Sequence, residues 1–251
     1  MTKPNYGIDA PGLVRGFFIG GLNCALLSFA IYYFLGFGAL WFALVLMVLA
    51  LISIYLLGMG SLMVFYSKIT KISDRDTVLN QIPWRGDERV LDVGCGRGLM
   101  LVGAAKRLTT GSAVGVDIWS AKDQSDNLPA AANANAVIEG VADRVELATA
   151  DARELPYDNR SFDVVMSHWV IHNIEKPEER QRALLEMVRV LKPGGHLLLS
   201  DIEHRESYMK LLTEFGLSNL RLLVDPNKDR FLRMVSFGSF GPSAIIAQKS
   251  Q

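Results

Sequence analysis

The chain has 251 residues, of which 50% are hydrophobic, and its 26 basic residues equal its 26 acidic residues. This balance argues against nucleic acid as the main partner, because nucleic-acid-binding domains present a basic surface. The length allows one large domain, or one domain of ordinary size with an appendage. The cysteines, Cys24 and Cys95, offer no disulfide framework, which is consistent with a reducing compartment.

No Asp, Glu, Lys or Arg occurs between Arg15 and Lys68. A membrane-spanning helix needs roughly 20 apolar residues, so this interval is too long for one span and fits two. We predict spans at residues 17–35 and 40–65, joined by a turn at residues 36–38. A secretory signal fits less well, because the apolar region is of double length and lacks a small-x-small cleavage site. A buried helical hairpin of a soluble protein is the other alternative.

Basic residues flank the charge-free interval on both sides. Lys3 and Arg15 precede it, and Lys68, Lys71 and Arg75 follow it, whereas the turn carries no charge. The positive-inside rule then predicts an integral membrane protein with both termini and the rest of the chain in the cytoplasm. Small and polar residues within the spans suit helix–helix contacts, so we also expect that copies of the chain could associate through the hairpin.

The sequence divides into three parts: a two-helix transmembrane hairpin at residues 1–66, a basic amphipathic linker at 67–86, and a further domain at 87–251. In the linker, a short helix ended by Pro83 would carry one apolar stripe, made of Ile69, Ile72, Val78, Leu79 and Ile82. Its basic residues, Lys68, Lys71 and Arg75, would then face lipid headgroups. A solvated basic connector is the alternative.

Residues 89–98 combine a short apolar run with three alternating glycines. Val90, Leu91 and Val93 predict a buried parallel strand. The glycines that follow it allow a sharp turn and a close approach of a ligand to the backbone, and residues 99–108 favour a helix. The order of strand, glycine loop and helix is typical of a nucleotide-type cofactor site in an open α/β sheet.

The details of this loop select among cofactors. A dinucleotide fingerprint requires glycine three residues after Gly96, where this chain has Leu99. Asp92 lies just before the first glycine, where its carboxylate would repel a pyrophosphate but suit a ligand that carries an ammonium group.

Strand and helix patterns alternate through residues 87–251, which predicts a Rossmann-like α/β domain with a mostly parallel sheet of seven strands. Acidic residues follow several strands, as at Asp117 and Asp151. The last two strands are expected to form an antiparallel edge pair. The expected strands are 89–93, 113–117, 144–149, 162–167, 196–200, 220–224 and 244–248. The expected helices are 127–139, 177–191 (ended by a turn at 192–195) and 207–215.

Five segments of this domain, in this order, resemble a class I (Rossmann-like) S-adenosylmethionine-dependent methyltransferase. The likeness covers about two-thirds of the chain, from near Asp87 to the end. The segments are 90–98 (VLDVGCGRG), 114–117 (VGVD), 150–156 (ADARELP), 161–165 (SFDVV) and 189–195 (RVLKPGG).

The resemblance implies S-adenosylmethionine as the cofactor and implies roles for residues at the strand ends. The glycine loop would hold the methionine part of the cofactor, Asp117 would bind the ribose hydroxyls, and Asp151 with Ala152 would lie along the adenine. No metal site is expected. The full predicted cofactor-binding set is Asp92, Gly94, Gly96, Gly98, Asp117, Ile118, Asp151, Ala152 and Ser167.

Methyl transfer to a protonated acceptor needs a base with a pKa near neutrality, and histidine titrates there. His168 and His172 are therefore the predicted catalytic residues, and their spacing of four would place them on one face of a helical turn. Cys95 is interpreted as a small loop residue and Arg97 as a surface residue at a helix start. A polar cluster is either a solvated loop or a cover for the cofactor: Ser120, Asp123, Gln124, Ser125 and Asn127.

Three classes of function follow. The first is a membrane-anchored methyltransferase that moves a methyl group to an apolar small molecule or lipid by in-line displacement. The second has the same chemistry on a soluble metabolite or a protein, with the hairpin serving only as an address. The third is a non-catalytic cofactor-binding scaffold, and the intact cofactor motifs argue against it.

Overall fold

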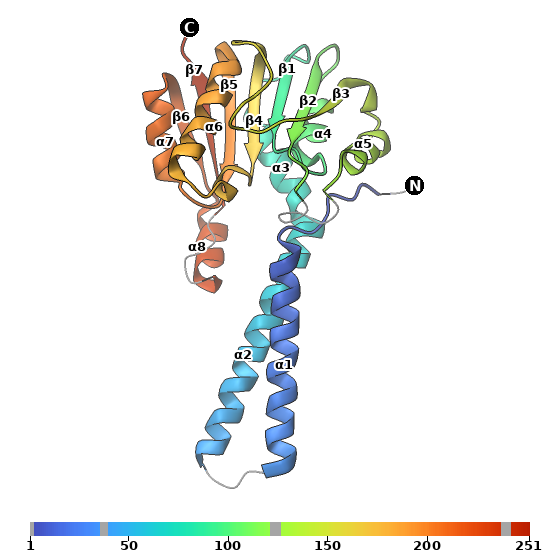
Figure 1. The fold of residues 1–251 in the computed structure, drawn as a ribbon, viewed down its shortest axis with the longest axis vertical. Coiled ribbons are helices and arrows are strands. Elements are labelled where there is room, and N and C mark those ends of the chain that lie inside the picture. The colour runs from blue at the N-terminus through green and yellow to red at the C-terminus, as the bar shows by residue number, and fades with distance from the viewer. Residues whose placement is uncertain (1–2, 36–39, 121–126, 237–241) are drawn as a thin grey trace. The chain divides into compact units, whose positions relative to one another are not determined.

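The computed structural model describes residues 3–35, 40–120, 127–236 and 242–251, which fall into two compact units (Figure 1). One unit holds the helical hairpin, within residues 7–71. The other holds the sheet, and it combines residues 72–120 and 127–251 with the first residues of the chain, up to Tyr6. The predicted turn at 36–38 and the part of the polar cluster at 121–126 lie outside the described residues.

The hairpin unit consists of α1 (Pro11–Leu35) and α2 (Leu40–Phe65). Both predicted helices are present, and α1 begins six residues earlier than expected. Each is long enough and apolar enough to cross a membrane. Large apolar side chains remain exposed around both helices, including Leu26, Phe34 and Ile54. Such exposure distinguishes this hairpin from the buried core helices of a soluble domain.

Close backbone contacts join α1 to α2. A Cβ atom on Gly21 would lie 2.7 Å from the Leu57 Cγ atom, so only glycine permits this approach. Ser53 Oγ donates a hydrogen bond to the Gly21 carbonyl at 2.8 Å. Before α1, the Asp9 carboxylate accepts bonds from Lys71 Nζ and Ser67 Oγ, both at 3.1 Å.

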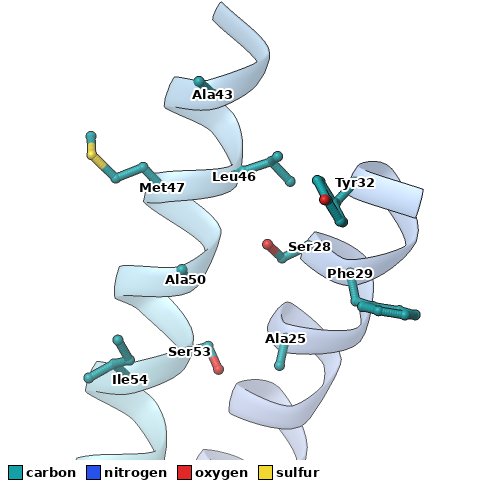
Figure 2. A pocket seen from close by; sticks show the side chains of 10 residues that line it. All are labelled: Ala25, Ser28, Phe29, Tyr32, Ala43, Leu46, Met47, Ala50, Ser53 and Ile54. Carbon is teal, nitrogen blue, oxygen red and sulfur yellow. The ribbon is translucent and has the colours of Figure 1, made fainter. Parts of the chain in front are cut away.

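Further along the hairpin, a groove of about 680 Å³ opens between α1 and α2 (Figure 2). Figure 2 shows Leu46 and Ser53 of α2 directed toward α1. The groove has mostly apolar and small lining residues: Ala25, Ser28, Phe29, Tyr32, Ala43, Leu46, Met47, Ala50, Ser53 and Ile54. Association of copies through the hairpin stays a prediction.

The linker differs from its prediction. A π-helix (Tyr66–Thr70) is followed by α3 (Lys71–Leu79). Lys68 is exposed, but Lys71 and Arg75 are only 4% and 3% exposed, so the expectation that these two face lipid headgroups is wrong. Lys71 pairs with Asp9, and Arg75 bonds both carboxylate oxygens of Asp76 at 3.0 and 3.1 Å. The charges are buried because each has a carboxylate partner.

The sheet has seven strands in the order β3-β2-β1-β4-β5-β7-β6. Strands β1 to β5 pair in parallel, whereas β7 runs antiparallel to both of its neighbours. This confirms the predicted Rossmann-like sheet with its antiparallel edge pair. The strands are β1 (Arg89–Val93), β2 (Ser112–Asp117), β3 (Val145–Thr149), β4 (Phe162–His168), β5 (Leu191–Asp201), β6 (Leu217–Leu223) and β7 (Ser243–Lys249).

Helices cover both faces of the sheet (Figure 1). On one face, α3, α4 (Leu99–Ala105) and α5 (Pro129–Ile138) enclose a core that includes Val90 of β1. On the other, α6 (Pro177–Val190) and α7 (Arg205–Glu214) enclose a core that includes Leu91. Consecutive residues of β1 thus feed opposite cores, as the alternation of side chains along a strand requires.

Two elements were not foreseen from the sequence. A helix, α8 (Pro226–Val235), lies between β6 and β7, and Asp225 caps it by accepting bonds from the amides of Asn227 and Lys228. Residues 192–195 were expected to form a turn, but they belong to β5, because α6 ends at Val190 and the strand begins at the next residue.

Candidate functional site

The carboxyl ends of the parallel strands meet at one edge of the sheet. The strand order reverses between β1 and β4, and in open α/β sheets a ligand crevice forms at such a switch point. At this place Val93 of β1 lies opposite Ser167 of β4. The side chain of Ser167 is fully buried, and its Oγ atom has no hydrogen-bond partner in the described structure.

The glycine loop folds back over the end of β2. The amides of Gly94 and Cys95 both donate to the Val116 carbonyl, at 2.7 and 3.0 Å. Gly94 has φ 75°, and a Cβ atom there would lie 2.3 Å from the Val170 side chain. The loop after β4 therefore packs directly on the glycine loop, and only glycine fits the contact.

Asp92 is buried at the base of this loop, close to the backbone amide of Leu101. The residue is 1% exposed, and within the described residues neither carboxylate oxygen accepts a hydrogen bond of normal geometry. Burial raises the pKa of Asp92 to about 8; the Leu101 amide opposes the rise, and the charge of Asp117 adds to it. An unpaired buried carboxylate is costly, and a ligand that carries an ammonium group would supply its missing partner. The site therefore fits the positive end of the implied cofactor.

Asp117 ends β2 and orders the surrounding backbone. Its Oδ2 atom accepts the Gly96 amide at 2.8 Å, while Oδ1 accepts the Trp119 amide at 2.6 Å and Asn127 Nδ2 at 3.3 Å. A carboxylate has about four acceptor positions, so capacity remains for ligand hydroxyls. Ile118, the next residue, is exposed. The ribose role of Asp117 and the contact of Ile118 stay predictions.

Asp151 lies just past β3 and is already ion-paired. Arg153 Nη2 lies 2.6 Å from Asp151 Oδ2, and Arg153 Nη1 contacts Glu179 of α6 at 2.5 Å. The hydrogen bond from Arg153 holds the pKa of Asp151 below its ordinary value. The predicted adenine contact of Asp151 and Ala152 stays a prediction, and it now has a competing partner in Arg153.

A histidine–aspartate pair joins the ends of β4 and β5. His172 Nδ1 lies 2.5 Å from Asp201 Oδ1, and the His172 backbone amide donates to Asp201 Oδ2 at 3.1 Å. Asp201 is buried, so the pair assigns the ring proton to Nδ1 and leaves Nε2 as an acceptor. Tyr208 of α7 lies beside Asp201; burial, then the Asp201 charge, raise the pKa of Tyr208.

The two predicted catalytic histidines do not share a helical turn, so that expectation is wrong. His168 is the last residue of β4, whereas His172 lies in a short 3₁₀-helix (Ile171–Asn173). The strand continues through His168 because residue 168 still pairs with Ser200 of β5. The His168 ring stacks on Trp169, with centroids 5.0 Å apart. His172 is paired with the Asp201 carboxylate.

Sequence reasoning missed Asp201, although a signal was present. Asp201 follows an apolar strand, as Asp92 and Asp117 do, and acids at the carboxyl ends of parallel strands gather at one edge. Its pairing with His172, 29 residues away, was not visible in the sequence.

Cys95 and Arg97, the other residues of the glycine loop, are both buried. Cys95 is buried against Gly115, and burial raises the pKa of its thiol well above the ordinary value, which agrees with a packing residue. Arg97 is 8% exposed, so its interpretation as a surface residue is wrong. Within the described residues, no group of His, Cys, Asp and Glu could hold a metal ion.

The sequence of the segment that forms this edge of the sheet is similar to that of a known protein family. Residues 91–199 match the family described as a methyltransferase domain. The matched segment extends from β1 into β5, so it contains the glycine loop, Asp117 and His172.

Two curated relatives illustrate the match. The 27-O-demethylrifamycin SV methyltransferase of Amycolatopsis mediterranei (strain S699) is 37% identical over 132 residues, 53% of this chain and 44% of that protein. The demethylmenaquinone methyltransferase of Symbiobacterium thermophilum is 32% identical over 119 residues, 47% of this chain and 44% of that protein. The chain thus spans less than half the length of these relatives.

A solved structure supports the fold. Geranyl diphosphate C-methyltransferase from Streptomyces coelicolor, in complex with Mg²⁺, geranyl diphosphate and S-adenosyl-L-homocysteine, aligns with a TM-score of 0.57 at 16% identity. The alignment covers 70% of this chain and 78% of that one. The sequence comparison thus finds a likeness to methyltransferase domains, and the structural comparison shows that the sheet unit shares their fold.

Proposed function

We propose that this chain is an S-adenosylmethionine-dependent methyltransferase that acts on an apolar small molecule or lipid. One observation carries the proposal: a buried carboxylate at the end of β1 and a histidine–aspartate pair at the ends of β4 and β5 belong to the same edge of the sheet. Asp92 offers a place for a positive ligand group, and His172 offers a basic nitrogen. Such a combination suits transfer from a cationic donor to a protonated acceptor.

The implied cofactor supplies an already activated methyl group when it is bound. Asp92 would pair with its ammonium group, and Asp117 would accept its ribose hydroxyls while continuing to hold the Gly96 amide. The chain then contributes chiefly orientation and exclusion of water, because the donor needs no further activation.

His172 would accept a proton from the acceptor at Nε2. Asp201 keeps the proton of the neutral ring on Nδ1 and stabilises the imidazolium that forms, as the carboxylate does in other His–Asp pairs. Trp169, which adopts a left-handed backbone conformation between the two histidines, would help to wall the crevice.

Two features support an apolar acceptor. The relatives named above act, by their names, on a rifamycin and on demethylmenaquinone. In this chain, β6 runs in the same direction as β5, so α8 follows β6 at the edge that bears the site. This helix exposes Phe231 and Met234. An apolar acceptor near the site would meet these side chains.

The proposal is tested with the full chain purified in detergent and S-adenosylmethionine labelled in its methyl group. Separate reactions would contain the enzyme, the labelled cofactor and one of three possible sources of acceptor: a membrane lipid extract, a water-soluble extract or a protein fraction. We expect label in the lipid extract, and its loss in Asp117→Ala but not in Asp163→Ala, a carboxylate at the opposite edge. Label found only in the soluble or protein fraction would mean that the hairpin serves only to locate the enzyme at the membrane. Absence of transfer to all three would favour a non-catalytic cofactor-binding scaffold.

We further propose that the hairpin is a two-span membrane anchor with both chain ends in the cytoplasm. The support is the charge-free interval, its basic flanks and the exposed apolar side chains of α1 and α2. Carbonate washing should leave the full chain in the membrane pellet. In a Cys24→Ser background, Leu40→Cys should react with an impermeant reagent only from the outer side. Release by carbonate would exclude the anchor, and reaction only from the cytoplasm would exclude the topology.

A further inference from the structure

The first residues of the chain belong to the sheet unit, beside α5 (Figure 1). We call residues 3–6 the N-terminal strap. The main chain of Asn5 forms a reciprocal pair with the Asn135 side chain of α5. The Asn5 amide donates to Asn135 Oδ1 at 2.8 Å, and Asn135 Nδ2 donates to the Asn5 carbonyl at 3.0 Å. Asn135 is 2% exposed, whereas Asn5 is exposed, so the pairing joins a buried side chain to a surface segment.

The strap also contacts the glycine loop. Arg97, which lies between Gly96 and Gly98, donates from Nε to the Asn5 carbonyl at 2.8 Å. Asn135 Nδ2 donates in addition to the Arg97 carbonyl at 2.9 Å. The same amide group therefore holds the strap and the backbone of the cofactor loop together.

Tyr6 anchors the end of the strap. Its side chain is buried, and its hydroxyl donates to Glu139 just past α5 at 3.3 Å. Burial, then the Glu139 carboxylate, raise the pKa of Tyr6, while the nearby Arg75 of α3 opposes the rise. The strap thus contacts α3, α5 and the glycine loop within one unit.

The glycine loop needs such support because its own backbone is permissive. Gly94, Gly96 and Gly98 all have positive φ. Glycine loses more conformational entropy on folding than any other residue, so a loop with three glycines is costly to hold in one conformation. Loss of the strap would exchange the bonds that Arg97 and Asn135 make to Asn5 for bonds to water. The loop would then lose a constraint on its backbone, so the loop and the strap should be ordered together.

We propose that the N-terminal strap positions the cofactor loop, with Asn135 as the positioning residue that connects them. This inference rests on the proposed cofactor role of the loop. It makes the segment that precedes α1 a functional part of the methyltransferase unit. Cofactor affinity in this chain should then depend on residues that lie outside the segment matched by the methyltransferase family.

The test uses the full chain with the Asn135→Asp and Asn135→Ala variants. The aspartate keeps the acceptor for the Asn5 amide but removes the donor to Arg97 and Asn5. Both variants should bind S-adenosylmethionine roughly fivefold or more weakly by calorimetry. In the absence of cofactor, backbone amides of residues 94–98 should exchange hydrogen several-fold faster. The matched control is Arg144→Ala, which removes bonds to the carbonyls of Leu108 and Gly140 away from the strap.

A second pair of variants changes only the strap. Asn5→Pro removes the backbone donor to Asn135, whereas Asn5→Ala keeps both main-chain groups, so their difference isolates the pairing. We expect Asn5→Pro to loosen the loop and weaken cofactor binding more than Asn5→Ala, without the larger loss of melting temperature that a buried helix substitution brings.

The outcomes separate this inference from the proposed function. Unchanged exchange at residues 94–98 in Asn135→Asp and Asn5→Pro would overturn the strap inference even if the cofactor binds. Faster exchange together with unchanged affinity would also overturn it. If the wild-type chain binds no S-adenosylmethionine, the proposed function fails, and this inference fails with it.

Discussion

Two deeply buried carboxylates, Glu88 at the amino edge of the sheet and Asp92 at the carboxyl edge, differ in their hydrogen bonds. At the amino edge, Glu88 is 2% exposed, yet its oxygens accept the amides of Arg85 and Gly86 at 2.6 and 2.9 Å. Asp163 at the same edge accepts the Arg89 amide and Lys192 Nζ, both at 2.9 Å. At the carboxyl edge, Asp92 is as buried as Glu88 and accepts no hydrogen bond of normal geometry.

The difference indicates that Glu88 has a structural role, whereas the carboxylate of Asp92 can still pair with a ligand. Buried polar groups in folded proteins are nearly always hydrogen-bonded, because an unpaired one is costly. The chain meets that requirement at Glu88, and also at the partly buried Asp163, and leaves it unmet at Asp92, next to the glycine loop. Substitutions at the two edges should therefore have contrasting effects on activity, binding and stability.

The largest contrast is expected between two histidines. His172→Ala should lower turnover by about 10²–10⁴ while leaving cofactor affinity intact, because it removes the proposed general base. His196→Ala, near the amino edge, should keep turnover near the wild-type value. Turnover, cofactor affinity and melting temperature would be measured for both variants, with His168→Ala in parallel. Full turnover in both His172→Ala and His168→Ala would exclude a histidine base.

A smaller contrast is expected between two aspartates. Asp117→Ala should weaken S-adenosylmethionine binding at least tenfold, since a charge-assisted hydrogen bond contributes roughly 1.5–3 kcal/mol. Asp163→Ala should lower stability through loss of its pairing with Lys192 and leave the affinity unchanged. Calorimetric titration of both variants checks this. Equal affinities for the two would remove the distinction between the edges.

The smallest contrast concerns stability and pH. Because burial raises the pKa of Asp92 to about 8, the folded chain keeps a proton that the unfolded chain loses near its ordinary pKa. Asp92 therefore destabilises the fold progressively as pH rises from about 4 to 8. Asp92→Asn should raise the melting temperature more at pH 8 than at pH 5, by roughly 2–4 °C for each kcal/mol of stability.

Asp163→Asn should show the opposite sign. The Lys192 and Arg89 donors outweigh the effect of partial burial and hold the pKa of Asp163 below its ordinary value. Asp163 therefore contributes stability above its unfolded pKa and loses it as pH falls through the folded pKa. The asparagine variant should melt lower than wild type at neutral pH and approach it in acid. Parallel melting curves for the two variants at several pH values would reveal whether the signs differ.

The elements that could be predicted from the sequence are those whose signals are local. Alternating apolar residues and glycines located β1 and its loop, and the charge-free interval located α1 and α2. Acids after β1 and β2 indicated the carboxyl edge, because parallel strands must end together. The helix α8 escaped prediction, since its residues 226–235 are largely polar, and only Leu232 among its apolar side chains is buried while Phe231 and Met234 are exposed.

The pairs that polar groups form could not be predicted in this way. His172 lies 29 residues from Asp201, and Asn5 lies 130 residues from Asn135, so no local pattern links either pair. The burial of Arg75, which a basic helical surface did not suggest, also depends on another element, because its side chain packs against Gly103 of α4. Periodicity records which residues face a core, but the pairing of polar side chains depends on how distant strands and helices come together.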